Sequence, residues 1–136
     1  MKTLVLYYSY TGHAKELAEA LAAQEAADIM EISDWHRPGK LIAYIKGCPA
    51  AAKGRSWAIA PIFPDWSAYE RVVLFSPVWA GGAPPAVNAM LEQLPGGKSV
   101  EVHMVSASGK SKCRSRIESA IKMKGSRPAS FEDIRA

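Results

Sequence analysis

The residues best suited to chemistry in this chain form three short loops of small and hydroxyl side chains. The first is Ser9-Tyr10-Thr11-Gly12-His13, which lies between an apolar run and an amphipathic segment. A helix beginning here directs free N–H groups and the positive end of its dipole at the loop, and both suit a phosphate. The hydroxyls of Ser9 and Thr11 add hydrogen bonds, and Gly12 allows the backbone to approach closely. The alternative is that Ser9 and Thr11 only cap the helix.

The other two loops follow apolar runs later in the chain. One is Pro77-Val78-Trp79-Ala80-Gly81, and the other is Ser106-Ala107-Ser108-Gly109. In a doubly wound parallel sheet, ligands bind outside the carboxyl ends of the strands, where the strand order reverses. We therefore expect all three loops to meet at one edge of a sheet. Trp79 can stack on a flat ligand there, or it can be a core tryptophan.

The elements that would position these loops are visible as hydrophobic patterns. β-prone runs at 3–8, 71–76 and 100–105 predict strands, with shorter ones at 27–32 and 129–134. Helical spacing of apolar residues predicts helices at 13–26, from Pro85 to Leu94, and from Cys113 to Gly125. This alternation favours a three-layer α/β fold, and the length fits one domain over residues 1–136.

Residues 33–66 are less regular. A helix after Gly39 through Cys48 is predicted, interrupted by Pro49, and 58–66 is predicted to be loop. A connection of this length in a compact domain favours a functional excursion or a small subdomain.

Two of the loops resemble those of a known family. Tyr7-Tyr8-Ser9-Tyr10-Thr11-Gly12 before a helix resembles the phosphate loop of flavodoxins. Ser76-Pro77-Val78-Trp79-Ala80-Gly81 before prolines and a helix resembles the second flavin loop of short flavodoxin-family proteins. The likeness extends over nearly the whole chain and implies a flavodoxin-like doubly wound parallel sheet of five strands in the order 2-1-3-4-5.

The resemblance also implies FMN as cofactor and assigns the residues that hold it. Its phosphate would be wrapped by Ser9, Tyr10, Thr11, Gly12, His13 and Ala14. The isoalloxazine ring would be lined by Pro77, Val78, Trp79, Ala80 and Gly81. The pyrimidine side would face backbone groups of Ser106, Ala107, Ser108 and Gly109.

The sequence departs from the flavodoxin pattern at two places. Ala14 stands where the family usually carries a hydroxyl, which removes one hydrogen bond worth about 0.5–1.5 kcal/mol. Lys110 and Lys112 follow the third loop, where low-potential flavodoxins resemble one another in having acidic residues. Because the reduced flavin is anionic and lysines favour it, we expect a higher midpoint potential than in a low-potential flavodoxin.

Other classes of protein fit less well. Gly109-Lys110-Ser111 lacks the earlier glycine of a P-loop, because position 104 is Met, and no G-x-G-x-x-G follows a strand. No run approaches the roughly 20 apolar residues of a transmembrane helix, and the first is too short for a signal peptide. The basic residues after position 109 lack interleaved aromatics. We therefore expect a cytoplasmic protein with reduced cysteines, no metal, and neither nucleic acid nor membrane as partner.

Three functions remain open at this point. The favoured one is a flavin electron carrier that serves a redox partner protein or a small-molecule acceptor, as monomer or homodimer. The second is a small FMN-dependent reductase of quinone-like acceptors, with residues 33–66 shaping the pocket. The third is a flavodoxin-like interaction domain that has lost FMN, which Ala14 would suit.

Overall fold

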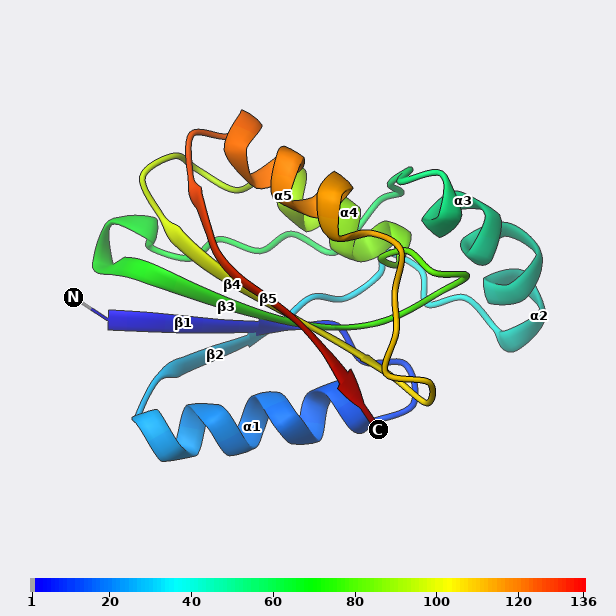
Figure 1. The fold of residues 1–136 in the computed structure, drawn as a ribbon, viewed down its shortest axis with the longest axis horizontal. Helices are drawn as coiled ribbons and strands as arrows, with labels where there is room; N and C mark the ends of the chain where they lie inside the picture. The colour runs from blue at the N-terminus through cyan, green and yellow to red at the C-terminus, as the bar shows by residue number, and fades with distance from the viewer. Residues whose placement is uncertain (1) are drawn as a thin grey trace.

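A parallel five-stranded sheet forms the centre of the protein (Figure 1). The computed structural model describes residues 2–136. In spatial order the strands are β2 (Asp28–Glu31), β1 (Lys2–Tyr7), β3 (Tyr69–Pro77), β4 (Ser99–Ser106) and β5 (Arg127–Arg135). Every neighbouring pair is parallel, which confirms the predicted order 2-1-3-4-5.

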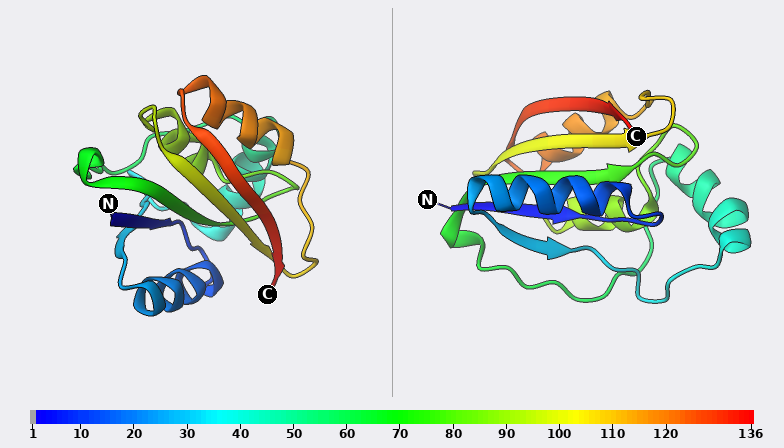
Figure 2. Two further views of the ribbon diagram at one scale, coloured as in Figure 1. Left: turned by 60° about the vertical axis from the view of Figure 1, so that its left-hand side comes forward. Right: turned by 90° about the horizontal axis from the view of Figure 1, so that it is seen from below.

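Helices cover the two faces of the sheet unequally (Figure 2). On one face α1 (His13–Glu25) packs Ala14, Ala18 and Ala22 against the apolar side chains of β1 and β3. On the other face lie α4 (Pro85–Glu92) and α5 (Arg114–Met123). Since β1 and β3 are covered on both sides, they are continuous apolar runs, as the sequence analysis expected.

On the α1 side, β4 presents the polar side chains of Glu101 and His103, which pair with residues of β3. Arg71 pairs with both Glu101 and Glu25, and His103 stacks on Phe75 with ring centroids 4.7 Å apart. Burial lowers the pKa of His103, and Glu132 nearby opposes that shift. The alternation of polar and apolar residues along β4 therefore reflects one covered face and one face without a helix over it among the described residues.

Residues 33–66 form a helical excursion and an extended return. The helical part is continuous from Lys40 to Ala52, as α2 (Lys40–Ile42), the π-helical η1 (Ala43–Gly47) and α3 (Cys48–Ala52), followed later by the 3₁₀ turn η2 (Trp66–Ala68). The prediction that Pro49 interrupts this helix is wrong. Pro49 follows directly on the π-helical turn η1, so the helical segment continues across the proline with a change in its hydrogen-bond pattern.

Candidate functional site

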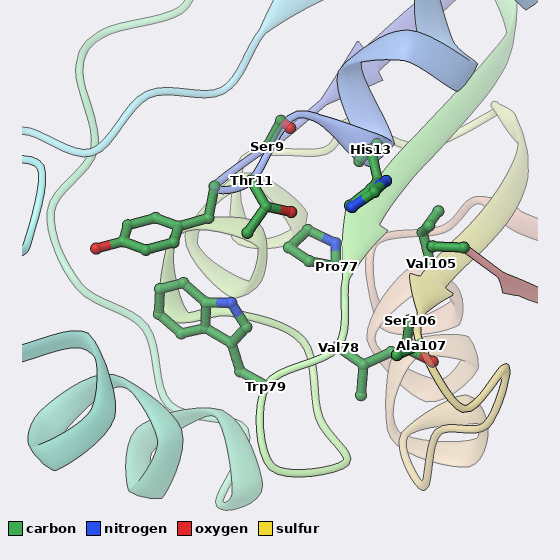
Figure 3. Close-up of a pocket in the computed structure, with 12 residues that line it drawn as sticks. Ser9, Thr11, His13, Pro77, Val78, Trp79, Val105, Ser106 and Ala107 are labelled. Atoms are coloured by element: carbon green, nitrogen blue, oxygen red, sulfur yellow. The ribbon is translucent and has the colours of Figure 1, made fainter. Parts of the chain in front are cut away.

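The three loops predicted to carry the chemistry meet at the carboxyl ends of β1, β3 and β4 (Figure 3). They enclose a cavity of about 360 Å³. Its walls are Ser9, Tyr10, Thr11, His13, Ala14, Pro77, Val78, Trp79, Val105, Ser106, Ala107 and Ala136. The position is the topological switch point, because the chain leaves β1 toward β2 on one side and later continues from β3 on the other.

A second cavity of about 540 Å³ adjoins the first and shares Val78, Ser106 and Ala107 with it. Its other walls are Ala80, Gly81, Ser108, Lys110, Ser111 and Lys112. Every predicted site residue therefore lines one of the two cavities except Gly12 and Gly109, which shape the turns beneath them. Val105, Ser111 and Ala136 also line these cavities and were not predicted, since nothing in their residue type marks a binding role.

The first loop leaves the beginning of α1 open toward the cavity. Gly12 has a φ of 105°, and its N–H donates to the Ser9 hydroxyl oxygen at 3.0 Å. The first helical hydrogen bond runs from the Glu16 N–H to the Gly12 carbonyl, and no side chain caps the helix. The backbone N–H groups of the first turn come before that of Glu16 and have no helical acceptor, as an anion site requires. The capping alternative for Ser9 and Thr11 is therefore wrong in this structure.

The loop after β4 repeats the turn of the loop after β1. Gly109 has a φ of 69°, and its N–H donates to the Ser106 hydroxyl oxygen at 3.0 Å. Both loops read Ser-x-Ser/Thr-Gly. In each, the first hydroxyl accepts a backbone bond and keeps its own proton to donate elsewhere.

The loop after β3 is a tight turn held from both sides. Trp79 and Gly82 exchange two backbone hydrogen bonds of 2.9 Å, and Ala80 and Gly81 both have positive φ, as in a type I′ turn. The Gly81 carbonyl accepts the N–H of Lys112 at 2.7 Å. On the other side, a Cβ added to Gly82 would lie 2.1 Å from a backbone oxygen of α3. At position 82 only glycine fits against α3.

Trp79 is buried in an aromatic cluster while one part of it lines the cavity. It is 9% exposed and packs edge-to-face against Tyr8, Tyr10 and Trp57. A Cβ added to Gly47 would lie 2.6 Å from its indole ring. This packing is that of a core tryptophan that also borders the site, and stacking on a ligand stays a prediction.

Arg37 supports the first loop from residues 33–66, and no sequence pattern pointed to it. Its guanidinium donates to the Tyr10 carbonyl at 2.9 Å and to the Ser9 carbonyl at 3.4 Å. The same group lies 4.6 Å from the centre of the Tyr10 ring, and the Tyr10 hydroxyl donates to the Pro38 carbonyl at 2.7 Å. The irregular excursion thus holds the outer side of the predicted phosphate loop.

A buried polar group also ties the excursion to the sheet. The Asp34 carboxylate accepts hydrogen bonds from the Tyr8 hydroxyl at 2.7 Å and from the Trp57 indole N–H at 2.9 Å. Burial, and then the bond to Asp34, raise the pKa of Tyr8. Tyr8 therefore keeps its proton and remains a donor at the base of the aromatic cluster.

The absence of a hydroxyl at Ala14 is explained by how its side chain packs. Its side chain is 2% exposed and lies in the core between α1 and the sheet, and the residue also borders the cavity.

Among residues 2–136, no group of three or more ligating side chains gathers where a metal could bind, and no helix has the length and apolarity to cross a membrane.

Comparison with known proteins gives likeness in structure alone. No protein-family model and no curated protein matches the sequence. The structure of a flavoprotein in complex with FMN from Lactobacillus acidophilus NCFM is 20% identical, with a TM-score of 0.76 over 97% of this chain and 93% of that one. The apo form of the flavoprotein from the same organism is 23% identical, with a TM-score of 0.67 over 97% and 92%.

A flavodoxin from Streptococcus pneumonia TIGR4 is 13% identical, with a TM-score of 0.59 over 100% of this chain and 87% of that one. These similarities, the strand order and the place of the cavity define the architecture. The chain has the flavodoxin-like fold.

Proposed function

We propose that this chain binds FMN and transfers electrons through it. The observation that carries the proposal is the cavity at the switch point, where the uncapped start of α1 faces the loops after β3 and β4. Structural neighbours described as a flavoprotein with FMN and as a flavodoxin support it.

The residues present fit the phosphate of FMN. The backbone N–H groups that begin α1 and the hydroxyls of Ser9 and Thr11 converge on the cavity, and Gly12 has no neighbour within 4 Å where a Cβ would stand. Ala14 offers no hydroxyl, so its contribution is its backbone N–H. These groups would hold the phosphate by neutral donors and the helix dipole.

The flavin ring would lie toward the loops after β3 and β4. When bound, FMN supplies the reversible electron acceptor. Val78 and Trp79 would exclude water from it, and the Ser106–Gly109 loop would meet its polar edge with backbone groups. Lys110 and Lys112 border the adjoining cavity, so their charge favours a ligand that gains negative charge on reduction.

A fluorescence titration tests the binding. FMN added to the apoprotein should lose its fluorescence, and riboflavin, which lacks the phosphate, should bind far more weakly. Equal binding of the two would refute the phosphate site. Failure of both to bind would favour an interaction domain without cofactor.

Two glycines provide a matched pair of variants for the same titration. Gly12 and Gly97 both have positive φ and open space where a Cβ would stand, but only Gly12 belongs to the loop. Gly12→Ala should weaken FMN binding by about tenfold through strain of about 1–2 kcal/mol in the loop, while Gly97→Ala should leave it unchanged.

Turnover assays separate the carrier from the reductase. A carrier should show no consumption of NAD(P)H with a quinone unless a partner reductase is added. Rapid oxidation of NAD(P)H by the FMN-loaded protein alone would favour the reductase.

A further inference from the structure

The helical segment Lys40–Ala52 exposes its large apolar side chains to solvent, unlike an ordinary surface helix. Its inner side presents Ala43, Gly47 and Ala51, which pack against the aromatic cluster around Trp79. A surface helix normally turns its large apolar residues inward. Here they point to solvent, and the outer face consists of Leu41, Ile42, Tyr44 and Ile45.

The exposure of this outer face is high for apolar side chains. Leu41 is 68% exposed, Tyr44 is 75% exposed and Ile45 is 55% exposed. Trp35, which is 57% exposed, shares a cavity of about 430 Å³ with Ile42 and Lys46 beside them. Most of the large apolar residues left in solvent within residues 2–136 thus belong to one excursion.

The charged side chains between Asp34 and Asp65, in the segment that carries the outer face, all have one sign. Between Asp34 and Asp65 the sequence contains no acidic residue. The basic residues of this stretch are all exposed, and they are Arg37, Lys40, Lys46, Lys53 and Arg55. An occupant of the outer face must therefore offer negative charge together with an apolar interior.

We propose that the outer face of Lys40–Ala52 docks on the surface of an anionic lipid bilayer. A basic rim around exposed aliphatic and aromatic side chains is the pattern of a segment that lies in the membrane interface without spanning it. The absence of a spanning run, on which the sequence-based expectation of no membrane partner rested, does not bear on this mode of binding.

Charge disfavours a second copy of the chain as the occupant. A second copy would bring the same basic rim against this one, and like charges across an interface repel. At roughly 200 Å² for each large side chain, the outer face and Trp35 expose about 600 Å² of apolar area. A bilayer accepts a small protruding face, because lipids adapt to its shape.

The position of the face gives the docking a consequence for the site. The segment projects beyond the edge of the sheet where the strands end (Figure 1), and its inner side contacts Trp79 at the cavity wall. A protein docked this way holds its cavity near the lipid, within reach of acceptors dissolved in the bilayer. The docking itself does not depend on the proposed binding of FMN.

Vesicle co-sedimentation tests the proposal with the whole chain. The protein should bind vesicles of phosphatidylcholine and phosphatidylglycerol in equal parts, and should bind pure phosphatidylcholine vesicles weakly. Salt should weaken the binding. Lys40→Gln with Lys46→Gln should weaken it by about twenty-five-fold, at about fivefold for each charge near an anionic bilayer.

The apolar contribution is tested by Leu41→Ser, Tyr44→Ser and Ile45→Ser together, which should reduce binding by more than about tenfold. The matched control changes an exposed apolar residue between two lysines on another face, as Lys122→Gln, Met123→Ser and Lys124→Gln, where Met123 is 86% exposed. This control should bind anionic vesicles as the parent does. Thermal melts confirm that each variant folds.

Three outcomes would overturn the proposal. They are no binding to anionic vesicles by the folded parent, equal loss in the control and the outer-face variants, or a concentration-dependent dimer in sedimentation velocity that only the outer-face variants abolish. The last result would assign the face to a second copy of the chain.

Discussion

Two tyrosine–aspartate hydrogen bonds in this chain allow one interaction to be compared in two environments. Tyr8 donates to Asp34 at 2.7 Å in the interior, and Tyr69 donates to Asp28 at 2.6 Å at the surface. Phenylalanine at either position removes the hydroxyl and keeps the ring. We predict that Tyr8→Phe destabilises the protein much more than Tyr69→Phe.

The magnitudes follow from burial. Tyr8 is 1% exposed, and a hydrogen bond to a charged group is worth about 1.5–3 kcal/mol, so Tyr8→Phe should cost about 2 kcal/mol. At the surface, water replaces the lost partner, and Tyr69→Phe should cost about 0.5 kcal/mol or less. For 136 residues at about 2.1 cal/mol/K each, 2 kcal/mol lowers Tm by about 7 °C.

Urea denaturation and thermal melts of both variants measure the difference. Asp34→Ala should cost more than Tyr8→Phe, because it leaves both Tyr8 and Trp57 without an acceptor. Equal losses for Tyr8→Phe and Tyr69→Phe would show that the buried bond adds nothing specific, and would refute the view that it anchors residues 33–66.

Three further predictions concern packing, pH and redox potential. Gly82→Ala should destabilise the protein by about 2–3 kcal/mol in urea titrations, since its Cβ would meet a rigid backbone carbonyl, while Gly39→Ala, with open space around it, should be nearly neutral. Because folding lowers the pKa of His103, the unfolded chain binds more protons than the folded one below about pH 6.5. The contribution of His103 to stability should therefore be full above that pH and should fall as the pH drops toward the folded pKa. His103→Gln should flatten this dependence of Tm on pH. In the FMN-loaded protein, Lys110→Gln with Lys112→Gln should lower the midpoint potential by about 20 mV per charge in spectroelectrochemical titration, for charges roughly 10 Å away in a solvent-like dielectric.

Each of these predictions has a control and a result that contradicts it. Equal stability of the two glycine variants would show that the loop after β3 can shift away from α3. His36→Gln, at an exposed histidine, controls for the loss of any imidazole, and an unchanged slope in His103→Gln would refute the assignment. A very low potential in the parent protein, or a potential unmoved by the lysine changes, would contradict the electrostatic argument.

The strands and the meeting of the three loops were predictable because they depend on local patterns. Continuous apolar runs mark β1 and β3, which are buried on both faces, and loops that follow parallel strands must share an edge. β5 runs from Arg127 to Arg135, beyond the predicted 129–134, because its polar outer residues weaken the strand pattern.

The excursion was less predictable because its role depends on long-range contacts. Arg37 acts on backbone carbonyls of the first loop, and a bond to a carbonyl leaves no mark on the sequence of the acceptor. Pro49 was misread because the π turn that lets the helical segment continue across a proline has no recognisable sequence pattern. Trp79 lies in the core and also borders the cavity, while its stacking on a ligand stays a prediction.

The assembly of the cavity from three loops has a consequence for folding. The loops after β1, β3 and β4 are separated by long stretches of chain, and parallel pairing brings them together only once the sheet has formed. A ligand held there binds the native state and not the unfolded chain. At about a hundred times its Kd it would add about 2.7 kcal/mol to the free energy of unfolding. The lifetime of this protein in a cell would then depend on the supply of its ligand.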